Sequence, residues 1–285
     1  MSVRREFLTG IERLNATTVV LQRARLAAPS TGIWDAADVQ WWWRRPRSTD
    51  DLALPVWFDE IGPVAAVGLT AWDETWQTDA FVASSVVPLE EVWNETMRAV
   101  SAYPVHSLRL ILPEQNNSLL ELAIQSGFKL TDEISGTTWI DIDNRPEIRR
   151  VDGFTVEDRT ARSHLVHPMV ARNGEFVESR LQECSLYEPT LDLAIEDKDG
   201  NVAGYALFWF DKSTLVGMLE PMRVEEGFQR RGLANFLITA GLDLLAQKGA
   251  TKVKVGFESE AALNLYLGIG FVQTSVDRLL TRSLT

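Results

Sequence analysis

The feature that most constrains this chain is a glycine-tipped loop between a strand-like stretch and a helix-like stretch in its second half. Residues 215–224 are apolar enough to form a strand, and apolar side chains recur at helical spacing over 235–245. The first N–H groups of a helix have no partner within it, and the aligned peptide dipoles favour an anion there. The order therefore predicts an α/β fold with a phosphate-binding helix start.

The residues of this loop suit a pyrophosphate, although an ordinary solvated loop before a helix would look similar. Gly232 lets the backbone approach the phosphates closely, and Ala234 intrudes little. Arg230 and Arg231 supply positive charge. A second segment favours the functional interpretation, because residues 259–270 predict a helix that ends in glycine and is followed by a strand over 271–274.

Together the two segments resemble motifs A and B of the GNAT superfamily of acyl-CoA-dependent N-acetyltransferases. Motif A reads Gln/Arg-x-x-Gly-x-Gly/Ala, and it is matched by Gln229, Gly232 and Ala234. Motif B reads Asn-x-x-Ala-x-x-Leu-Tyr-x-x-x-Gly-Phe, and its matches are Ala262, Leu265, Tyr266, Gly270 and Phe271. The chain departs from motif B at Ser259, where the family usually has asparagine. Order, spacing and predicted element type agree.

The rest of the second half fits the order of elements that the resemblance implies. Strands are predicted over 154–158, 191–196, 202–210 and 253–257, with a hairpin turn at Asp199-Gly200 between the second and third. The resemblance implies a mixed α/β fold, in which a mostly antiparallel, twisted sheet carries helices on both faces.

The first half of the chain carries a weaker copy of the same pattern. Gly127-Phe128 ends a helix-like run over 116–126, and an offset of 143 residues places Asn116 on Ser259. Residues 63–72 and 80–87 are candidate paired strands. We interpret residues 1–146 as a degenerate GNAT-like domain in tandem with a second one. The alternative is a chance similarity between two helices that end in Gly-Phe.

The first half lacks the features that a CoA site requires. A helix opens directly at 88–97, without the glycine tip or the arginine pair, and acidic residues occupy its start. We therefore expect residues 1–146 to lack a CoA site and residues 147–285 to form the catalytic domain. A length of 285 residues suits two domains, and the polar, proline-containing segment 141–147 is the expected linker.

The composition limits where the protein is expected to occur and which classes of partner it is expected to bind. The net charge of −12 argues against general nucleic-acid binding, although it suits attraction of a cationic amine as well as simple solubility. The single cysteine, Cys184, excludes a disulfide within the chain. No signal-peptide pattern and no membrane-spanning apolar run is evident. We expect a cytoplasmic protein that binds neither nucleic acid nor membrane.

Tryptophan is concentrated in the first half, which holds nine of the ten: Trp34, Trp41, Trp42, Trp43, Trp57, Trp72, Trp76, Trp93 and Trp139. Three consecutive tryptophans on a helix would point about 100° apart, so one face cannot bury them all. We expect Trp41-Trp42-Trp43 to bridge a core and a second surface. That surface could be an interdomain seam, a homodimer contact or a substrate wall, with simple core packing as the alternative.

The resemblance implies how acetyl-CoA would be held. Backbone groups of Met222, Arg223 and Val224 would pair with the pantetheine arm and polarise the thioester carbonyl. The pyrophosphate would contact the residues of the loop and helix start, which are Gln229, Arg230, Arg231, Gly232, Leu233, Ala234 and Asn235.

The resemblance also implies a catalytic acid, whereas the base is less determined. Tyr266 occupies the position of the general acid that protonates the departing thiolate, and the alternative is a tyrosine that only packs its ring. Glu220 lies on the strand of Met222 and, by period two, on the same face. It is our candidate general base and would accept the proton of the amine directly or through water. Alternatively, Glu220 has only a structural role, or a chain of water molecules removes the proton. Glu258 and Glu260 are weaker candidates for the base.

These patterns predict an N-acetyltransferase that moves an acetyl group from acetyl-CoA to a primary amine of a small molecule or peptide in a ternary complex. The alternatives are a non-catalytic acyl-CoA sensor or scaffold and an enzyme that uses a longer acyl donor. The three histidines, His106, His164 and His167, show no metal-ligand spacing, and we expect no metal.

Overall fold

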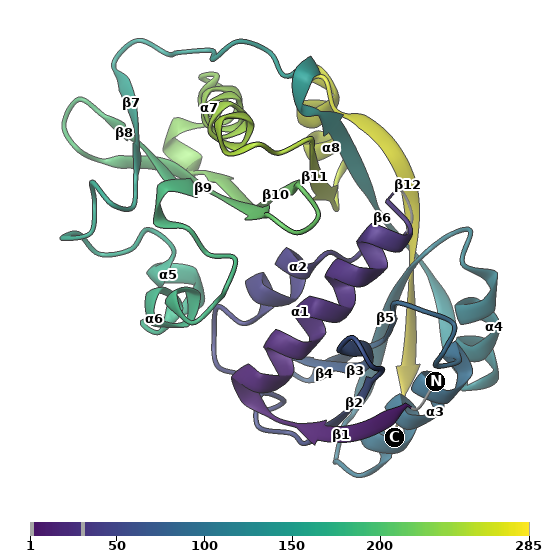
Figure 1. The fold of residues 1–285 in the computed structure, drawn as a ribbon. Coiled ribbons are helices and arrows are strands. Elements are labelled where there is room, and N and C mark those ends of the chain that lie inside the picture. The colour runs from purple at the N-terminus through teal and green to yellow at the C-terminus, as the bar shows by residue number, and fades with distance from the viewer. Residues whose placement is uncertain (1–2, 30–31, 285) are drawn as a thin grey trace. The chain divides into compact units, whose positions relative to one another are not determined.

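The computed structural model describes residues 3–29 and 32–284, and the chain divides into two compact units (Figure 1). Unit 1 comprises Met1–Ser135 together with Ser275–Thr285, and unit 2 comprises Gly136–Thr274. Each unit combines helices with a mixed sheet, and most strand pairs within each sheet are antiparallel. The predicted α/β class is confirmed.

Unit 1 builds its sheet in the order β1-β2-β3-β4-β5-β12. All of its neighbouring strands are antiparallel except β4 and β5, which run parallel. Its elements in chain order are β1 (Arg4–Leu8), α1 (Gly10–Ala27), α2 (Ala36–Trp42), β2 (Leu54–Phe58), β3 (Pro63–Trp72), β4 (Thr75–Val82), α3 (Leu89–Ser101), β5 (Ser107–Pro113), α4 (Asn117–Gln125) and the first part of β6 (Lys129–Asp141).

Unit 2 builds its sheet in the order β6-β11-β10-β9-β8-β7, with β10 and β11 parallel. Short 3₁₀ turns lie at Ile142–Asn144, Pro189–Leu191 and Glu226–Phe228. Its other elements in chain order are β7 (Phe154–Asp158), α5 (Val170–Asn173), α6 (Val177–Gln182), β8 (Asp192–Asp197), β9 (Val202–Asp211), β10 (Val216–Val224), α7 (Leu233–Lys248), β11 (Lys252–Phe257), α8 (Glu260–Ile269) and the first part of β12 (Val272–Ser283).

The same order of elements occurs twice along the chain, which confirms the predicted repeat. Each copy runs strand, two helices, three strands, helix, strand, helix and strand. The helix caps also correspond, because the Asn116 side chain accepts a hydrogen bond from the Leu119 N–H at 3.2 Å and the Ser259 hydroxyl accepts one from Ala262 at 3.2 Å. Serine thus caps its helix as asparagine does in the other copy.

The division of the chain differs from the predicted boundary at residue 146. The end of β6 pairs with β11 from Gly136 to Asp141, and the end of β12 pairs with β5 from Asp277 to Ser283. The expected linker 141–147 is also packed, because Ile142 is buried and Arg145 pairs with Asp243 at 3.2 Å. A polar, proline-containing composition did not distinguish this packed segment from an open linker.

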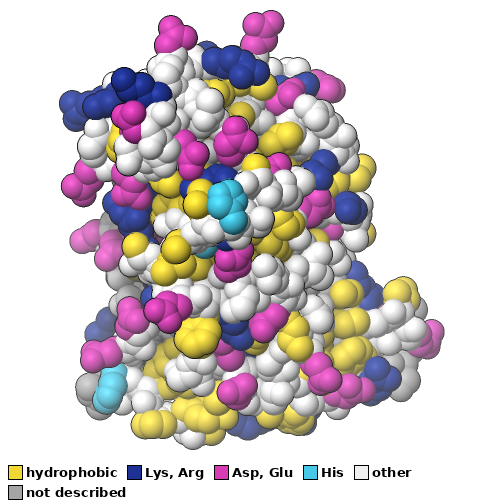
Figure 2. All heavy atoms as spheres, turned by 90° about the vertical axis from the view of Figure 1, so that its left-hand side faces the viewer, with side chains coloured by type: hydrophobic (Ala, Val, Ile, Leu, Met, Phe, Trp, Pro, Cys, Tyr) yellow, Lys and Arg dark blue, Asp and Glu magenta, His cyan; other side chains and the backbone are white. Residues whose placement is uncertain are grey.

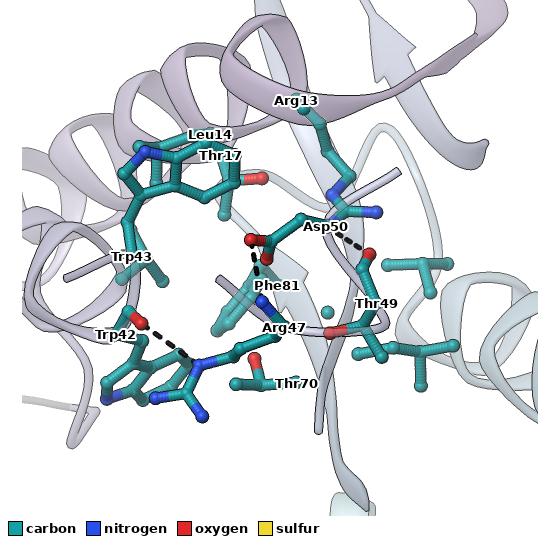
Figure 3. A pocket seen from close by; sticks show the side chains of 15 residues that line it. Arg13, Leu14, Thr17, Trp42, Trp43, Arg47, Thr49, Asp50, Thr70 and Phe81 are labelled. Carbon is teal, nitrogen blue, oxygen red and sulfur yellow. Dashed lines mark hydrogen bonds between the residues drawn. The ribbon is translucent and has the colours of Figure 1, made fainter. Parts of the chain in front are cut away.

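The three consecutive tryptophans are all buried, as the alternative of simple core packing predicts. Helix α2 ends at Trp42, and Trp43 is its C-cap. The Trp42 ring packs edge-on against Trp34 and Trp72, at centroid distances of 4.9 and 6.3 Å. Figure 3 shows Trp43 beside Leu14 and Thr17 of α1. A short helix covered on several sides can bury residues that point in different directions.

Helix α7 crosses the core of unit 2, and a glycine permits its close approach to β9. The core around it includes Phe208, Leu237 and Leu245, each fully buried. A Cβ atom built on Gly241 would overlap the Phe208 ring. The small residue at 241 therefore determines how closely the helix lies to the sheet that carries the site.

Gly241→Ala should lower the free energy of unfolding by about 1–3 kcal/mol, because the added methyl group has no room beside Phe208. Gly268→Ala in α8 is the matched control, since nothing lies within 4 Å of its added Cβ. The control should leave stability unchanged or raise it by up to ~1 kcal/mol. Urea unfolding of the two variants measures both values, and equal stability of the two would contradict this packing.

Candidate active site

The central feature of unit 2 is the point where two parallel strands part. Strand β10 pairs with β11 only over Val216–Met218. Beyond Met218, β10 continues to pair with β9, while β11 continues to pair with β6. The edge of β10 that faces away from β9 is therefore open to an added extended ligand from Leu219 onward.

A bulge in β10 displaces the candidate base from the position that simple alternation predicts. Leu219 pairs with Phe208 and Met222 with Ala206, so β10 carries one extra residue there. Leu219 and Met222 both pack against the same core, although three residues separate them. The expectation that Glu220 and Met222 share a face by period two is therefore wrong. Glu220 lies within the bulge, where the Trp209 indole donates to its backbone oxygen at 2.8 Å.

The predicted phosphate loop leads directly into α7. Gly232 is the N-cap and adopts the left-handed conformation with φ 82°, and Arg230 has φ 60°. Such angles favour glycine at the cap. The Gln229 side chain donates to the Val224 carbonyl at 3.2 Å and thereby ties the loop to the end of β10.

The start of α7 retains the features of an anion site. No acidic residue lies in its first turn, and no side chain caps its N–H groups. Arg230 and Arg231 are exposed, and within the described ranges 3–29 and 32–284 neither forms an ion pair. The Asn235 Oδ1 atom is buried without a hydrogen-bond partner among those residues. The helix dipole, two arginines and an unused polar atom are brought together here.

The structure brings Tyr266 and Glu220 close enough to interact electrostatically. Tyr266 is 6% exposed, and its ring packs against Phe271 at a centroid distance of 5.9 Å. Burial, followed by the charge of Glu220, raises the pKa of Tyr266. The phenol therefore keeps its proton at neutral pH, as a proton donor must. Glu258 and Glu260 are exposed at the start of α8.

Sequence reasoning missed a buried network in the segment before β8. His167 Nε2 lies 2.8 Å from Asp192 Oδ2, and the Tyr187 hydroxyl donates to the same oxygen at 2.9 Å. His167 Nδ1 accepts from the Met169 N–H at 3.2 Å, which leaves the ring proton on Nε2. Pairing of His167 with Asp192, 25 residues away, has no local sequence signal. The network ties the segment between β7 and β8 to the start of β8.

The same segment is joined to the end of β10 by a two-pronged ion pair. The two terminal guanidinium nitrogens of Arg172, Nη1 and Nη2, each donate to one carboxylate oxygen of Glu225 at 2.9 Å. The hydrogen bonds from Arg172 lower the pKa of Glu225. Three large apolar side chains of this segment are exposed, namely Leu165, Val166 and Phe176. Figure 2 shows hydrophobic side chains exposed among charged ones on the face in view.

Unit 1 repeats the strand opening but not the phosphate site. Strands β4 and β5 pair only over Thr75–Gln77. Helix α3 then starts after Pro88 rather than a left-handed glycine, with Glu90 and Glu91 in its first turn. Carboxylates at a helix start repel an anion. The geometry thus agrees with the interpretation of the first half as a degenerate copy.

The opening in unit 1 holds a buried carboxylate at the position that corresponds to Glu220. Asp79 lies two residues beyond the last parallel pair of β4, as Glu220 does on β10. It is 3% exposed and accepts from Trp34 Nε1 and Gln77 Nε2, both at 2.9 Å. Burial raises the pKa of Asp79 to about 6, despite those two hydrogen bonds and the charge of Arg109.

The pKa of Asp79 makes a testable contribution to stability. Between pH 6 and its ordinary pKa of 3.8, the folded state holds a proton that the unfolded state has lost. This contribution to the free energy of unfolding therefore rises as pH falls through that range, by up to about 3 kcal/mol. Relative to that of Asp79→Asn, the free energy of unfolding of the native protein should therefore rise by up to about 3 kcal/mol between pH 7 and pH 4.

Urea unfolding at several pH values measures the difference between the native protein and Asp79→Asn. Asp199→Asn, at an exposed turn between β8 and β9, is the matched control and should show no comparable trend. A difference between Asp79→Asn and the native protein that stays flat from pH 7 to pH 4 would contradict the burial of a proton at Asp79.

Three further observations on the described residues add no group to the site in unit 2. A cavity of about 60 Å³ in unit 1 lies beside Arg47 and Asp50 and contains none of the predicted site residues (Figure 3). Across residues 3–29 and 32–284, no cluster of three metal-ligating side chains is found. Within the same ranges, no helix combines the length and apolar character needed to cross a membrane.

Comparisons with known proteins agree with this geometry. The model of the acetyltransferase (GNAT) family matches residues 157–271. A mycothiol acetyltransferase of Clavibacter michiganensis subsp. michiganensis is 31% identical over 137 residues, and a similar protein of Clavibacter sepedonicus is 30% identical over the same length. Each match covers 45% of this chain and 44% of the relative, less than half of either protein.

Solved structures resemble the chain over nearly its whole length. A tandem GNAT protein from the clavulanic acid biosynthesis pathway has a TM-score of 0.69 at 13% identity, covering 99% of this chain and 98% of its own. A GCN5-related N-acetyltransferase from Sphaerobacter thermophilus has a TM-score of 0.61 at 14% identity, covering 99% and 95%. The chain therefore has the fold of a tandem GNAT protein, and its residues 157–271 match the GNAT acetyltransferase family.

Proposed function

We propose that this protein is an N-acetyltransferase that moves an acetyl group from acetyl-CoA to a primary amine, with its active site in unit 2. The observation that carries the proposal is the convergence of four groups on the open part of β10. These are the strand edge beyond Met218, the α7 start at Gly232, the Tyr266 phenol and the Glu220 carboxylate.

The phosphate end of acetyl-CoA would bind at the start of α7. Gly232 presents the first backbone N–H groups of the helix, and Arg230 and Arg231 add two charges that no carboxylate of the described residues neutralises. Anion binding at such a helix start needs both backbone donors and a favourable dipole. Leu233, Ala234 and Asn235 would supply the remaining first-turn contacts.

The pantetheine arm would extend along β10 as an added strand. Met222, Arg223 and Val224 pair with β9 on one side, at Ala206, Tyr205 and Gly204. Their other edge does not pair with β11. Backbone amides there would bond to the amides of the arm, and one N–H would stabilise the negative charge that develops on the thioester oxygen.

The reaction would proceed by direct attack of the amine on the thioester carbon. A carbon–nitrogen bond forms and the carbon–sulfur bond breaks, which leaves an amide and the CoA thiolate. Glu220 would accept the proton that the amine loses, directly or through water, and Tyr266 would donate its proton to the thiolate. The electrostatic interaction between Glu220 and Tyr266 supports the assignment of both groups to one site.

Tyr266→Phe should reduce turnover about 10²-fold while leaving the affinity for acetyl-CoA within twofold, because only the proton donor is removed. The rate of thiol release from acetyl-CoA with an amine acceptor measures turnover, and calorimetry measures affinity. Tyr103→Phe, at a tyrosine that packs against Trp76 in unit 1, is the matched control and should keep full activity.

Activity should be tested with a panel of amine acceptors that contains aminoglycosides, polyamines, amino acids and peptide amino termini. Mass spectrometry identifies the N-acetyl product. Unchanged turnover in Tyr266→Phe across pH would remove its assigned role. Binding of acetyl-CoA without transfer to any member of the panel would instead favour a non-catalytic sensor. Preference for a longer acyl-CoA in direct competition would change the donor and leave the site in place.

A further inference from the structure

A cavity of about 330 Å³ lies where β4 and β5 part in unit 1. Its volume falls at the lower end of the roughly 300–1,000 Å³ that is usual for small-molecule pockets. It is about twice the ~150 Å³ cavity that accommodates a benzene molecule. Side chains from α1, the segment between α1 and α2, β4, β5, α4 and the start of α3 line it, and most of them are apolar.

Three of the lining side chains carry a charge or an amide, and two of these bind other groups of unit 1. Arg25 is 4% exposed and bonds to both carboxylate oxygens of Asp35, at 2.6 and 3.1 Å. Asn116 caps α4 by accepting from the Leu119 N–H. The remaining one is Asp79.

Within the described ranges, Asp79 forms no ion pair, although the charge of Arg109 acts on it. Its two hydrogen-bond donors, Trp34 Nε1 and Gln77 Nε2, are neutral. An ionised carboxylate has about four acceptor positions, so two of them remain unused. A buried carboxylate that forms no ion pair carries a desolvation cost, which a cation bound in the cavity would offset.

The surroundings of this cavity disfavour a phosphate-bearing ligand. Leu89 lines the cavity and is the first residue of α3. Glu90 and Glu91 follow it in the first turn, with Glu95 one turn further on. Their negative charges face any phosphate that approaches the helix start. A neutral or cationic ligand meets no repulsion from these carboxylates.

We propose that this cavity of unit 1 is a second ligand site that binds a small, mostly apolar primary amine through its ammonium group. The ammonium pairs with Asp79, and the apolar part packs against Ile33, Trp34, Leu112 and Leu119. Burial keeps the pKa of Asp79 at about 6, so the carboxylate is ionised at pH 7.5 and available to a cation. The site is separate from the acetyl-transfer site proposed in unit 2 and does not depend on it.

Calorimetric titration at pH 7.5 with 4-phenylbutylamine and with the neutral 4-phenylbutan-1-ol tests the proposal. The two probes have nearly the same shape and differ in charge. The amine should bind at least tenfold more tightly to the native protein. Asp79→Asn should reduce that preference to less than twofold and leave the affinity for the alcohol unchanged.

A control variant separates this site from the amine-acceptor site proposed in unit 2. Glu220→Gln removes the corresponding carboxylate on β10 and should leave the tighter binding of the amine intact. Loss of the preference in Glu220→Gln instead of Asp79→Asn would place the amine in unit 2 and overturn the proposal. Failure of acetyl transfer with retained Asp79-dependent binding would affect only the proposed enzyme function.

The position of the bound amine can be observed directly. In ¹⁵N-labelled protein, the indole N–H signal of Trp34, assigned with Trp34→Phe, should shift as the amine is added. Because Asp79→Asn could alter folding, Ala24→Phe provides a second test that keeps the carboxylate and fills the cavity. It should abolish binding of both probes at an unchanged circular dichroism spectrum.

Two further results would overturn the proposal. The first is equal affinity of the amine and the alcohol for the native protein, which would leave Asp79 without a role in recognition. The second is displacement of the amine by acetyl-CoA both in the native protein and in Glu220→Gln, together with a shift of the Trp34 signal by acetyl-CoA alone. That outcome would assign the cavity to an acyl-CoA.

Discussion

The parting of two parallel strands is the constraint on which the rest of this structure depends. In each unit, the central strand pairs with its parallel neighbour for only three residues. Beyond that point, the strand keeps one partner and presents its other edge. An open edge of backbone donors and acceptors must be satisfied by a ligand, by water or by side chains. The opening at this position therefore follows from topology before any side chain is considered.

The chemistry of each opening is then set by a few residues. In unit 2, a left-handed glycine and two arginines precede α7, and the opening favours an anion. In unit 1, a proline and two glutamates occupy the corresponding helix start. Each central strand places a carboxylate two residues beyond its last parallel pair, at Asp79 and at Glu220. One fold thus supplies two openings of different charge.

The sequence predicted those features that depend on local chemistry. The helix starts, Gly232, the hairpin turn and the order of strands follow from glycine, capping residues and apolar periodicity, and β7 was predicted to the residue. Features that depend on contacts between residues far apart in the sequence could not be predicted from it. The bulge at Glu220, the bond between His167 and Asp192, and the pairing of the ends of β6 and β12 join residues with no local signal. Burial of three consecutive tryptophans likewise depends on elements that pack on several sides of a short helix.

We expect acetyl-CoA to bind only at the opening with the arginines. Calorimetric titration of the protein with acetyl-CoA tests it most directly, by counting sites and locating them. We predict one site per chain, weakened at least tenfold when Arg230 and Arg231 are both changed to alanine. Arg98→Ala, at an exposed arginine of α3, should leave binding unchanged. No binding, two sites per chain, or an affinity unchanged by replacing Arg230 and Arg231 would contradict a single acetyl-CoA site at the start of α7.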